Sequence, residues 1–299
     1  MNPKIQHRIF MVDVFAEKPW SGNPLAVIVS DKELPTGVMQ HIAAETNFSE
    51  TTFIRSEPEA SGAFSVRIFT PAREIRFTGH PILGTAWVIR NHIINNNQDP
   101  VHLNTAIGTI RVSFENDSDG SNIVWFEAPN MTIESDVPKE FTARSLGLTT
   151  ADIDSNLPVQ VVSAGTSAMI VPLCNADALA RSQLNLQAFE PLAAQGLKPL
   201  IYVFCRQPQH PGNDFRVRFF FEAHGVREDP ATGNGAAFLG AYLLAQKTES
   251  NFDQSMKIEQ GFELRRPSLI RMHLVRKNNK PIVRIGGSVI PTVVGELAI

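Results

Sequence analysis

Two halves of the chain carry the same motif in the same order, and this duplication constrains the fold more than any other feature. A strand-like run at residues 64–69 is followed by the pattern RExxxTG at 73–79, and a second run at 215–220 is followed by RExxxTG at 227–233. An apolar stretch rich in small residues follows each Thr-Gly, as expected for a helix buried on all sides. The sequence therefore predicts one β-rich module used twice, each copy wrapped around a helix that opens at Thr-Gly.

The composition supports an ordinary globular chain with two such modules. Of the 299 residues, 43% are hydrophobic and 19% are charged, enough apolar material for a core and too little charge for disorder. The stretch 127–138 contains two prolines and little periodicity, and it is predicted to cross between domains. We expect an N-terminal domain at 1–127, joined by a C-terminal return strand at 288–299, and a second domain at 128–287.

Charge and hydropathy exclude several classes of function. The formal net charge is −3, from 27 Lys and Arg against 30 Asp and Glu, so binding of nucleic acid through phosphate neutralisation is not expected. The apolar run at 9–12 is too short for a secretory signal, and the stretch 235–246 is shorter than the about 20 residues of a membrane span. We expect a cytoplasmic protein in which Cys174 and Cys205 are buried, inert thiols.

Local patterns predict individual elements. A helix is expected over residues 38–45, after the start signal at Leu34-Pro35-Thr36. A hairpin is expected from strands at 270–274 and 282–285, joined by a polar turn at 277–280.

Each Thr-Gly has two interpretations. Glycine at a helix start lets a ligand approach the backbone N–H groups, which carry the positive end of the helix dipole. Two such helix starts would bind a small carboxylate, and both copies keep an acidic residue upstream, which favours this view. Alternatively, Thr78 and Thr232 simply cap buried helices.

Three titratable residues near these motifs are candidates for catalysis or binding. Glu50, between a loop and an apolar strand, could act as a general base, although a glutamate there is commonly a solvated strand end. His80, beside a helix start, is expected to stay neutral and to hydrogen-bond a substrate or cap the helix. Asp229 lies in the second RExxxTG motif.

No cofactor is expected. His224, Glu228 and Asp229 lie close together, but they lack the ligand spacing of known zinc motifs, and no other metal set is evident. The glycine patterns match neither GxGxxG nor GxxxxGK[ST], so nucleotide cofactors are not indicated.

A set of motifs in fixed order makes a more specific identification possible. They are Val12-Asp13-Val14-Phe15, Gly22-Asn23-Pro24, residues 47–53 (NFSETTF), Phe69-Thr70-Pro71, residues 79–84 (GHPILG), residues 228–233 (EDPATG) and Gln260-Gly261. In these motifs the chain resembles the PhzF-like family of phenazine biosynthesis isomerases, which has the diaminopimelate epimerase-like fold.

The resemblance implies a cofactor-independent isomerase that forms a homodimer. Its fold would be α+β, with two pseudo-symmetric domains, each a curled mixed β-sheet or barrel around a central helix. The family's catalytic glutamate matches Glu50, which would move a proton between two carbons of a carboxylate-bearing substrate in a cleft between the domains. Residues that would bind the substrate are His80, Asp229, Asn23, Gly79, Gly233 and Asn234.

Two departures from related proteins bear on the chemistry. Asn234 stands directly after EDPATG, where the phenazine enzyme has serine, so the phenazine substrate is not assured. Thr78 and Thr232 stand where epimerases of this fold have catalytic cysteines, and a hydroxyl is too weak an acid to replace a thiol. The main hypothesis is an isomerase with Glu50 as general acid/base. The alternatives are a non-catalytic small-molecule-binding protein and a carboxylate-based amino-acid epimerase.

Overall fold

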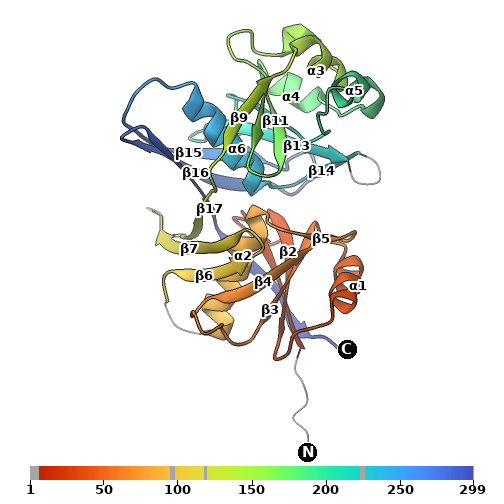
Figure 1. Ribbon diagram of the computed structural model, residues 1–299. Coiled ribbons are helices and arrows are strands. Elements are labelled where there is room, and N and C mark those ends of the chain that lie inside the picture. The colour runs from red at the N-terminus through yellow and green to blue at the C-terminus, as the bar shows by residue number, and fades with distance from the viewer. Residues whose placement is uncertain (1–6, 95–97, 118–119, 223–225, 299) are drawn as a thin grey trace, which may run out of the picture. The chain divides into compact units, whose positions relative to one another are not determined.

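The computed structural model describes residues 7–94, 98–117, 120–222 and 226–298. The chain divides into two compact units. The N-terminal unit runs to Glu127 and includes the stretch from Gly286 onward, and the C-terminal unit runs from Ala128 to Ile285. Each unit is α+β, with the elements labelled in Figure 1.

The N-terminal unit combines a mixed sheet with two α-helices. Its elements are β1 (His7–Val14), β2 (Asn23–Ser30), α1 (Thr36–Thr46), β3 (Glu50–Arg55), β4 (Phe64–Phe69), β5 (Glu74–Ile75), α2 (Gly79–Val88), a π-helical turn (Ile89–Ile93), β6 (Val101–Thr105), β7 (Gly108–Asn116), β8 (Asn122–Glu127) and β18 (Val289–Glu296). The strand order is β18-β1-β2-β3-β4-β6-β7-β8, with β2–β3 and β4–β6 parallel and the other neighbours antiparallel.

The C-terminal unit follows the same plan with more helices. Its elements are β9 (Thr132–Asp136), α3 (Lys139–Ser145), a 3-10 turn (Thr150–Asp152), β10 (Gln160–Ser163), β11 (Ser167–Pro172), α4 (Ala176–Arg181), α5 (Leu186–Ala193), β12 (Ile201–Cys205), β13 (Phe215–Glu222), β14 (Val226–Asp229), α6 (Gly233–Ala245), β15 (Phe252–Gln260), β16 (Ser268–Lys277) and β17 (Lys280–Gly287). The strand order is β9-β10-β11-β12-β13-β15-β16, with β11–β12 and β13–β15 parallel.

The pairing from β18 to β7 and the pairing from β9 to β16 are equivalent strand by strand, so the repeat in the sequence is a repeat of topology. The runs 64–69 and 215–220 form β4 and β13, each of which pairs with the short strand that carries the acidic residue of RExxxTG. Among the described strands of either unit, no pairing joins the two ends of the sheet. The sheets are therefore open, so of the two expected forms, a curled mixed sheet or a barrel, the structure shows the sheet.

Each sheet is covered on one face by surface helices and wraps a buried helix on the other. In β2, Ala26 and Ile28 belong to the apolar cluster with Met39 of α1, while Leu25 packs against α2. This division follows from the alternation of side chains along a strand. Strands β1, β2, β3, β6, β7, β8 and β18 all contact α2, so the predicted central helix is confirmed.

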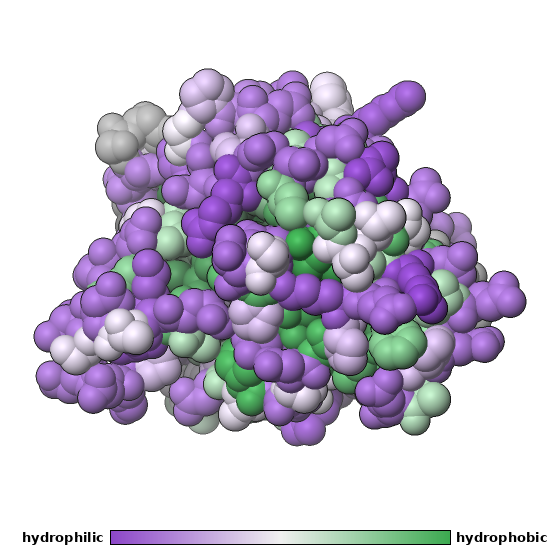
Figure 2. Space-filling view, turned by 90° about the horizontal axis from the view of Figure 1, so that it is seen from above, coloured by the Kyte–Doolittle hydropathy of each residue, from purple (hydrophilic) through white to green (hydrophobic). Residues whose placement is uncertain are grey.

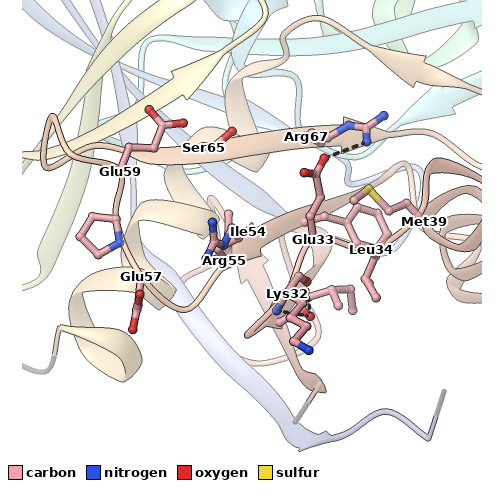
Figure 3. Close-up of a pocket in the computed structure, with 14 residues that line it drawn as sticks. Lys32, Glu33, Leu34, Met39, Ile54, Arg55, Glu57, Glu59, Ser65 and Arg67 are labelled. Carbon is pink, nitrogen blue, oxygen red and sulfur yellow. Dashed lines mark hydrogen bonds and ion pairs between the residues drawn. The ribbon is translucent and has the colours of Figure 1, made fainter. Parts of the chain in front are cut away.

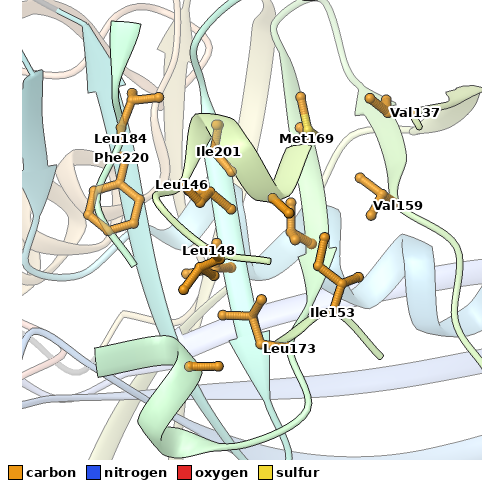
Figure 4. Close-up of a cluster of buried hydrophobic side chains, with 14 of the residues drawn as sticks. Val137, Leu146, Leu148, Ile153, Val159, Met169, Leu173, Leu184, Ile201 and Phe220 are labelled. Atoms are coloured by element: carbon orange, nitrogen blue, oxygen red, sulfur yellow. The ribbon is translucent and has the colours of Figure 1, made fainter. Parts of the chain in front are cut away.

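The C-terminal unit repeats this layering. Figure 4 shows the apolar cluster that the sheet forms with helices α3, α4 and α5, with Ile201 of β12 among its labelled residues. Val203 and Cys205 of the same strand belong to this cluster. The alternate residues of β12 face α6 instead: Phe204 packs edge-on against Tyr242, and Tyr202 lies against Gly235.

Several local expectations are confirmed and two are wrong. The helix at 38–45 is α1, and the hairpin turn consists of Asn278 and Asn279, both with positive φ, as tight hairpins require. The stretch 127–138 is more than a crossing, because it contains β9, whose exposed polar residues give no apolar signal. Cys174 is exposed rather than buried, because β11 ends at Pro172 and the thiol lies beyond it.

Hydrophilic residues cover most of the face seen in Figure 2, and hydrophobic ones show between them in small areas. Among the described residues, no helix has both the length and the apolar character needed to cross a membrane.

Candidate functional site

Glu50 is the first residue of β3 and follows directly on the turn that ends α1. Asn47 ends that helix in the left-handed conformation, with its backbone N–H donated to the carbonyl of Ala43 at 3.2 Å. The chain therefore enters β3 after only Phe48 and Ser49. The Glu50 side chain is 14% exposed, so its carboxylate is largely shielded from water.

Asn23 reaches the same place from β2 because of the glycine before it. Gly22 has a φ of +67°, and a Cβ there would lie 2.3 Å from the carbonyl oxygen of Val14, so only glycine fits. This turn starts β2 at Asn23, whose side chain is fully buried.

His80, in the first turn of α2, lies between the other two side chains and is only 2% exposed. Its Nδ1 is 3.3 Å from the amide nitrogen of Asn23, and its Nε2 is 3.3 Å from Oε2 of Glu50. Since an amide nitrogen donates, Nδ1 accepts, and the proton of the neutral ring is assigned to Nε2. Nε2 is thus in close contact with the Glu50 carboxylate, although the structure forms no hydrogen bond between the two atoms.

The charge state of His80 determines what this group can do. Burial lowers the pKa of His80 to about 3, so the imidazole is neutral near pH 7. The helix dipole alone predicts a neutral His80; the structure gives the same state with burial as its cause. A neutral imidazole places no positive charge beside Glu50, so it does not bias that carboxyl group toward its ionised form. This suits a group that must both take and return a proton.

A second group of candidate residues lies in the C-terminal unit. Asp229, the last residue of β14, is buried, and its Oδ2 accepts a hydrogen bond from the hydroxyl of Thr232 at 2.6 Å. The fully buried side chain of Gln260 donates through Nε2 to the carbonyl of Asp229 at 2.8 Å and to Oγ1 of Thr232 at 3.0 Å. Asp229 is therefore held by both main-chain and side-chain bonds.

The threonines stand where helix caps were expected but do not act as caps. Thr78 and Thr232 precede α2 and α6 in extended conformation, and neither side chain bonds to its helix. Gly79 and Gly233 are the first, buried residues of these helices. Asn234 follows, partly exposed.

The structure thus groups the seven predicted site residues into two sets. Asn23, Glu50, Gly79 and His80 come together in the N-terminal unit, and Asp229, Gly233 and Asn234 come together in the C-terminal unit. The described residues contain no cluster of His, Cys, Asp and Glu able to hold a metal ion, and His224, considered above, lies outside them.

Sequence reasoning assigned no role to Gln260 and did not consider Tyr202. Gln260 is distant in sequence from Asp229, and its only local signal is the Gln-Gly pair that ends β15, where Gly261 has a φ of +82°. Tyr202 is fully buried, and its hydroxyl has no hydrogen-bond partner within the described structure. Nothing in the run IYVFC distinguishes this tyrosine from an ordinary core residue.

The N-terminal unit also has a cavity of about 200 Å³ on the other face of its sheet. Figure 3 shows its lining, where Lys32, Glu33, Arg55 and Glu57 are charged and Arg67 points toward Glu33. The cavity opens on the α1 side, to which Phe53 and Met39 belong. Side chains alternate along β3, and Thr52, of the same parity as Glu50, bonds to Thr85 of α2. The cavity is therefore separate from the Glu50 site.

Comparison with known proteins gives one consistent family. The chain matches the PhzC-PhzF model, described as phenazine biosynthesis-like protein, over residues 12–295. An uncharacterized isomerase of Mesorhizobium japonicum is 33% identical over 97% of this chain and 98% of its own length. The trans-2,3-dihydro-3-hydroxyanthranilate isomerase of Pseudomonas fluorescens is 33% identical over 88% of this chain and 89% of its own.

Solved structures agree on the fold. A phenazine biosynthesis protein of the PhzF family from Bacillus anthracis superposes with a TM-score of 0.88 at 26% identity, covering 99% of this chain and 100% of the other. A hydroxyproline epimerase from Agrobacterium vitis gives a TM-score of 0.62 at 11% identity, covering 100% and 94%. At that identity the second likeness concerns the fold alone.

Proposed function

This chain belongs to the PhzC-PhzF family of phenazine biosynthesis-like proteins, and from that premise we propose that it moves a proton on a small carboxylate-bearing substrate, with Glu50 as general acid/base. It is an isomerase, and its two α+β units have the diaminopimelate epimerase-like fold.

The observation that carries the proposal is the contact between Glu50 and His80. A carboxylate oxygen of Glu50 lies 3.3 Å from Nε2 of a buried, neutral imidazole, whose Nδ1 is 3.3 Å from the amide nitrogen of Asn23. General-base catalysis needs an ionised carboxylate that can become neutral when it takes a proton. A neutral imidazole at this distance permits both states, whereas a cationic histidine would hold the carboxylate ionised.

The proposed reaction needs no cofactor. Glu50 takes a proton from one carbon of an unsaturated substrate, and the electron pair of the broken C–H bond shifts through the adjoining double bond. The resulting carboxylic acid of Glu50 then returns the proton to a second carbon. Atoms and charge balance, and the product is an isomer of the substrate.

We further propose binding roles for residues at the starts of the two buried helices and for Asp229. The starts of α2 and α6, at Gly79 and Gly233, offer backbone N–H groups that suit a carboxylate. Asp229 would accept a hydrogen bond from another part of the substrate. Asn234 would contact the substrate through its amide, which differs in reach from the serine of the phenazine enzyme.

The test is incorporation of solvent deuterium, followed by NMR. The native protein is incubated in D₂O with trans-2,3-dihydro-3-hydroxyanthranilate and with a panel of cyclic unsaturated carboxylates and amino acids. We expect deuterium to enter a carbon position of at least one substrate, and Glu50→Gln to abolish this while leaving the fold intact. Glu57→Gln, an exposed glutamate in the same unit, is the matched control and should retain full incorporation.

The two alternatives give different results in the same experiment. A binding protein without catalysis would show saturable binding of a panel member and no deuterium. An epimerase would exchange the α-hydrogen of an amino acid and remove its optical activity. Full activity of Glu50→Gln would overturn the assignment of Glu50.

Two further expectations stay proposals with their own tests. We propose a homodimer, on the family resemblance, to be checked by light scattering of the native chain. We also propose a cytoplasmic location, supported by two free cysteines, one of them exposed, which is typical of a reducing compartment. Cell fractionation would test it.

A further inference from the structure

We infer that Thr232 and Gln260 are positioning residues that hold Asp229 as a hydrogen-bond acceptor, so that the C-terminal unit recognises an amino or hydroxyl group of the substrate. The substrate part of this inference rests on the proposed function, in which Asp229 contacts the substrate. The positioning part rests on the hydrogen bonds among these three residues.

The orientation of the Gln260 amide follows from its partners. The backbone N–H of Thr232 can only donate, and it lies 3.0 Å from Oε1 of Gln260. The carbonyl of Asp229 can only accept, and it lies 2.8 Å from Nε2. The amide can therefore take only one of its two flipped orientations, and Nε2 must be the group that faces Oγ1 of Thr232 at 3.0 Å.

The direction of the Thr232 hydroxyl follows in turn. Its oxygen accepts an N–H of Gln260, so its single proton is available for the 2.6 Å bond to Oδ2 of Asp229. Oδ2 of Asp229 is therefore the acceptor in this bond. In its ionised form, a carboxylate held in this way accepts hydrogen bonds from a ligand and donates none, so its partner on the substrate is an N–H or O–H group.

Burial makes this arrangement rigid. Gln260 is fully buried, and Thr232 and Asp229 are nearly so, so water does not compete well for the three bonds. Ser268 also donates to the carbonyl of Pro230 at 3.0 Å, which holds the loop between Asp229 and Thr232 independently. The loop is therefore expected to keep its course when the Thr232 hydroxyl is removed.

The same geometry excludes Thr232 as a base. Epimerases of this fold have a catalytic cysteine at this place, as noted in the sequence analysis. Here the hydroxyl donates its proton to Asp229, while its oxygen accepts a hydrogen bond from Nε2 of Gln260. Thr232 thus acts through Asp229 and not on the substrate.

The first test compares Thr232→Val, which has nearly the same shape without the hydroxyl, with Thr232→Ser, which keeps it. With trans-2,3-dihydro-3-hydroxyanthranilate as substrate, we expect Thr232→Val to raise KM about ten- to a hundredfold, the usual cost of a lost charged hydrogen bond. Thr232→Ser should rescue most of this loss, and Gln260→Glu, which cannot donate to Oγ1, should behave like Thr232→Val. Equal KM values for the valine and serine variants would overturn the inference, as would a lower Tm without a change in KM.

A second readout does not depend on turnover. In protein labelled with ¹³C at aspartate carboxyl carbons, the Asp229 resonance is assigned by its loss in Asp229→Asn and then followed against pH. Its titration should move to higher pH in Thr232→Val and not in Thr232→Ser. Tyr202 stays neutral throughout, because burial and then the charge of Asp229 raise its pKa.

The two readouts separate the inference from the proposed function. If the native protein does not turn over the substrate while the Asp229 titration moves as expected, the positioning role stands and the proposed substrate class is wrong. An Asp229 titration that is identical in the native protein and both variants overturns the positioning role whatever the activity.

Discussion

Arg218 and Glu228 form a buried ion pair through two parallel hydrogen bonds, from Nε at 2.9 Å and from Nη2 at 2.8 Å. Their side chains are only 8% and 11% exposed. In the N-terminal unit, Arg67 binds Glu74 in the same way, with both bonds at 2.8 Å, but Glu74 is 41% exposed. The acidic residue of each RExxxTG motif thus forms an ion pair with an arginine on the preceding strand. This pairing explains why both motifs contain an acidic residue, with no need for a ligand.

This difference in burial predicts unequal effects of the same substitution. Glu228→Gln leaves the Arg218 charge buried without its partner. Nη1 of Arg218 already donates to the carbonyls of Leu179, Ala180 and Ser182. The substitution should therefore lower the unfolding free energy by about 3 kcal/mol or more. Glu74→Gln, its counterpart, should cost about 1 kcal/mol or less, because solvent screens an exposed pair. Urea unfolding of both variants measures this, and equal losses would contradict it.

The fold could be predicted from the sequence because the repeat is local and ordered. The runs 64–69 and 215–220, with the helices after Thr-Gly, are enough to fix two equivalent modules. Strand β9 could not be found, since its side chains are all exposed and an edge strand needs no apolar pattern. Cys174 was misplaced because hydropathy does not show where β11 ends.

Burial of His80 predicts a specific dependence of stability on pH. Its pKa is about 3 in the folded protein and about 6.5 when unfolded. Between these values the unfolded chain binds one proton more, so the unfolding free energy falls by up to about 1.4 kcal/mol per unit as the pH decreases. Nothing is lost above pH 6.5.

The check is urea unfolding between pH 4.5 and 7.5 with the native chain and His80→Gln, which cannot titrate. The carboxyl groups are the same in both proteins, so the difference between their slopes isolates His80. The slope should be smaller in His80→Gln. Parallel curves would show that His80 takes up its proton at the same pH in the folded and unfolded protein, and would contradict the lowered pKa.

The candidate site could be predicted only as far as single motifs allow. Asn23, Glu50 and His80 lie in three motifs, and only the parallel pairing of β2 with β3 and the packing of α2 on that face bring them together. The protonation of His80 depends on its burial and on its contact with Asn23, and the GHP motif predicts neither of these. Gln260 acts through an amide whose orientation only the folded neighbours determine.

Asn23 should control the tautomer of His80. In the native protein we expect ¹⁵N NMR to show the proton on Nε2, because Nδ1 accepts from Asn23. Asn23→Asp supplies an acceptor of nearly the same shape, so a proton should appear on Nδ1, and the isomerase rate should fall at least about a hundredfold, as with other misplaced imidazole protons. His7, bonded to Ser30 at 3.0 Å, is the internal control and should give an unchanged spectrum. A native Nδ1 proton would contradict the assignment.

Gly235 should be essential for packing Tyr202 at the start of α6. A Cβ at Gly235 would lie 2.4 Å from two carbons of the Tyr202 ring, so Gly235→Ala should cost about 1–3 kcal/mol through overpacking. Gly37 in α1 has no neighbour within 4 Å of such an atom, and Gly37→Ala should instead stabilise the protein by about 0.5–1 kcal/mol. Adding Tyr202→Leu to Gly235→Ala should recover part of the loss, which a double-mutant cycle by urea unfolding measures. Strict additivity of the two free-energy changes would show that the introduced Cβ does not clash with the Tyr202 ring.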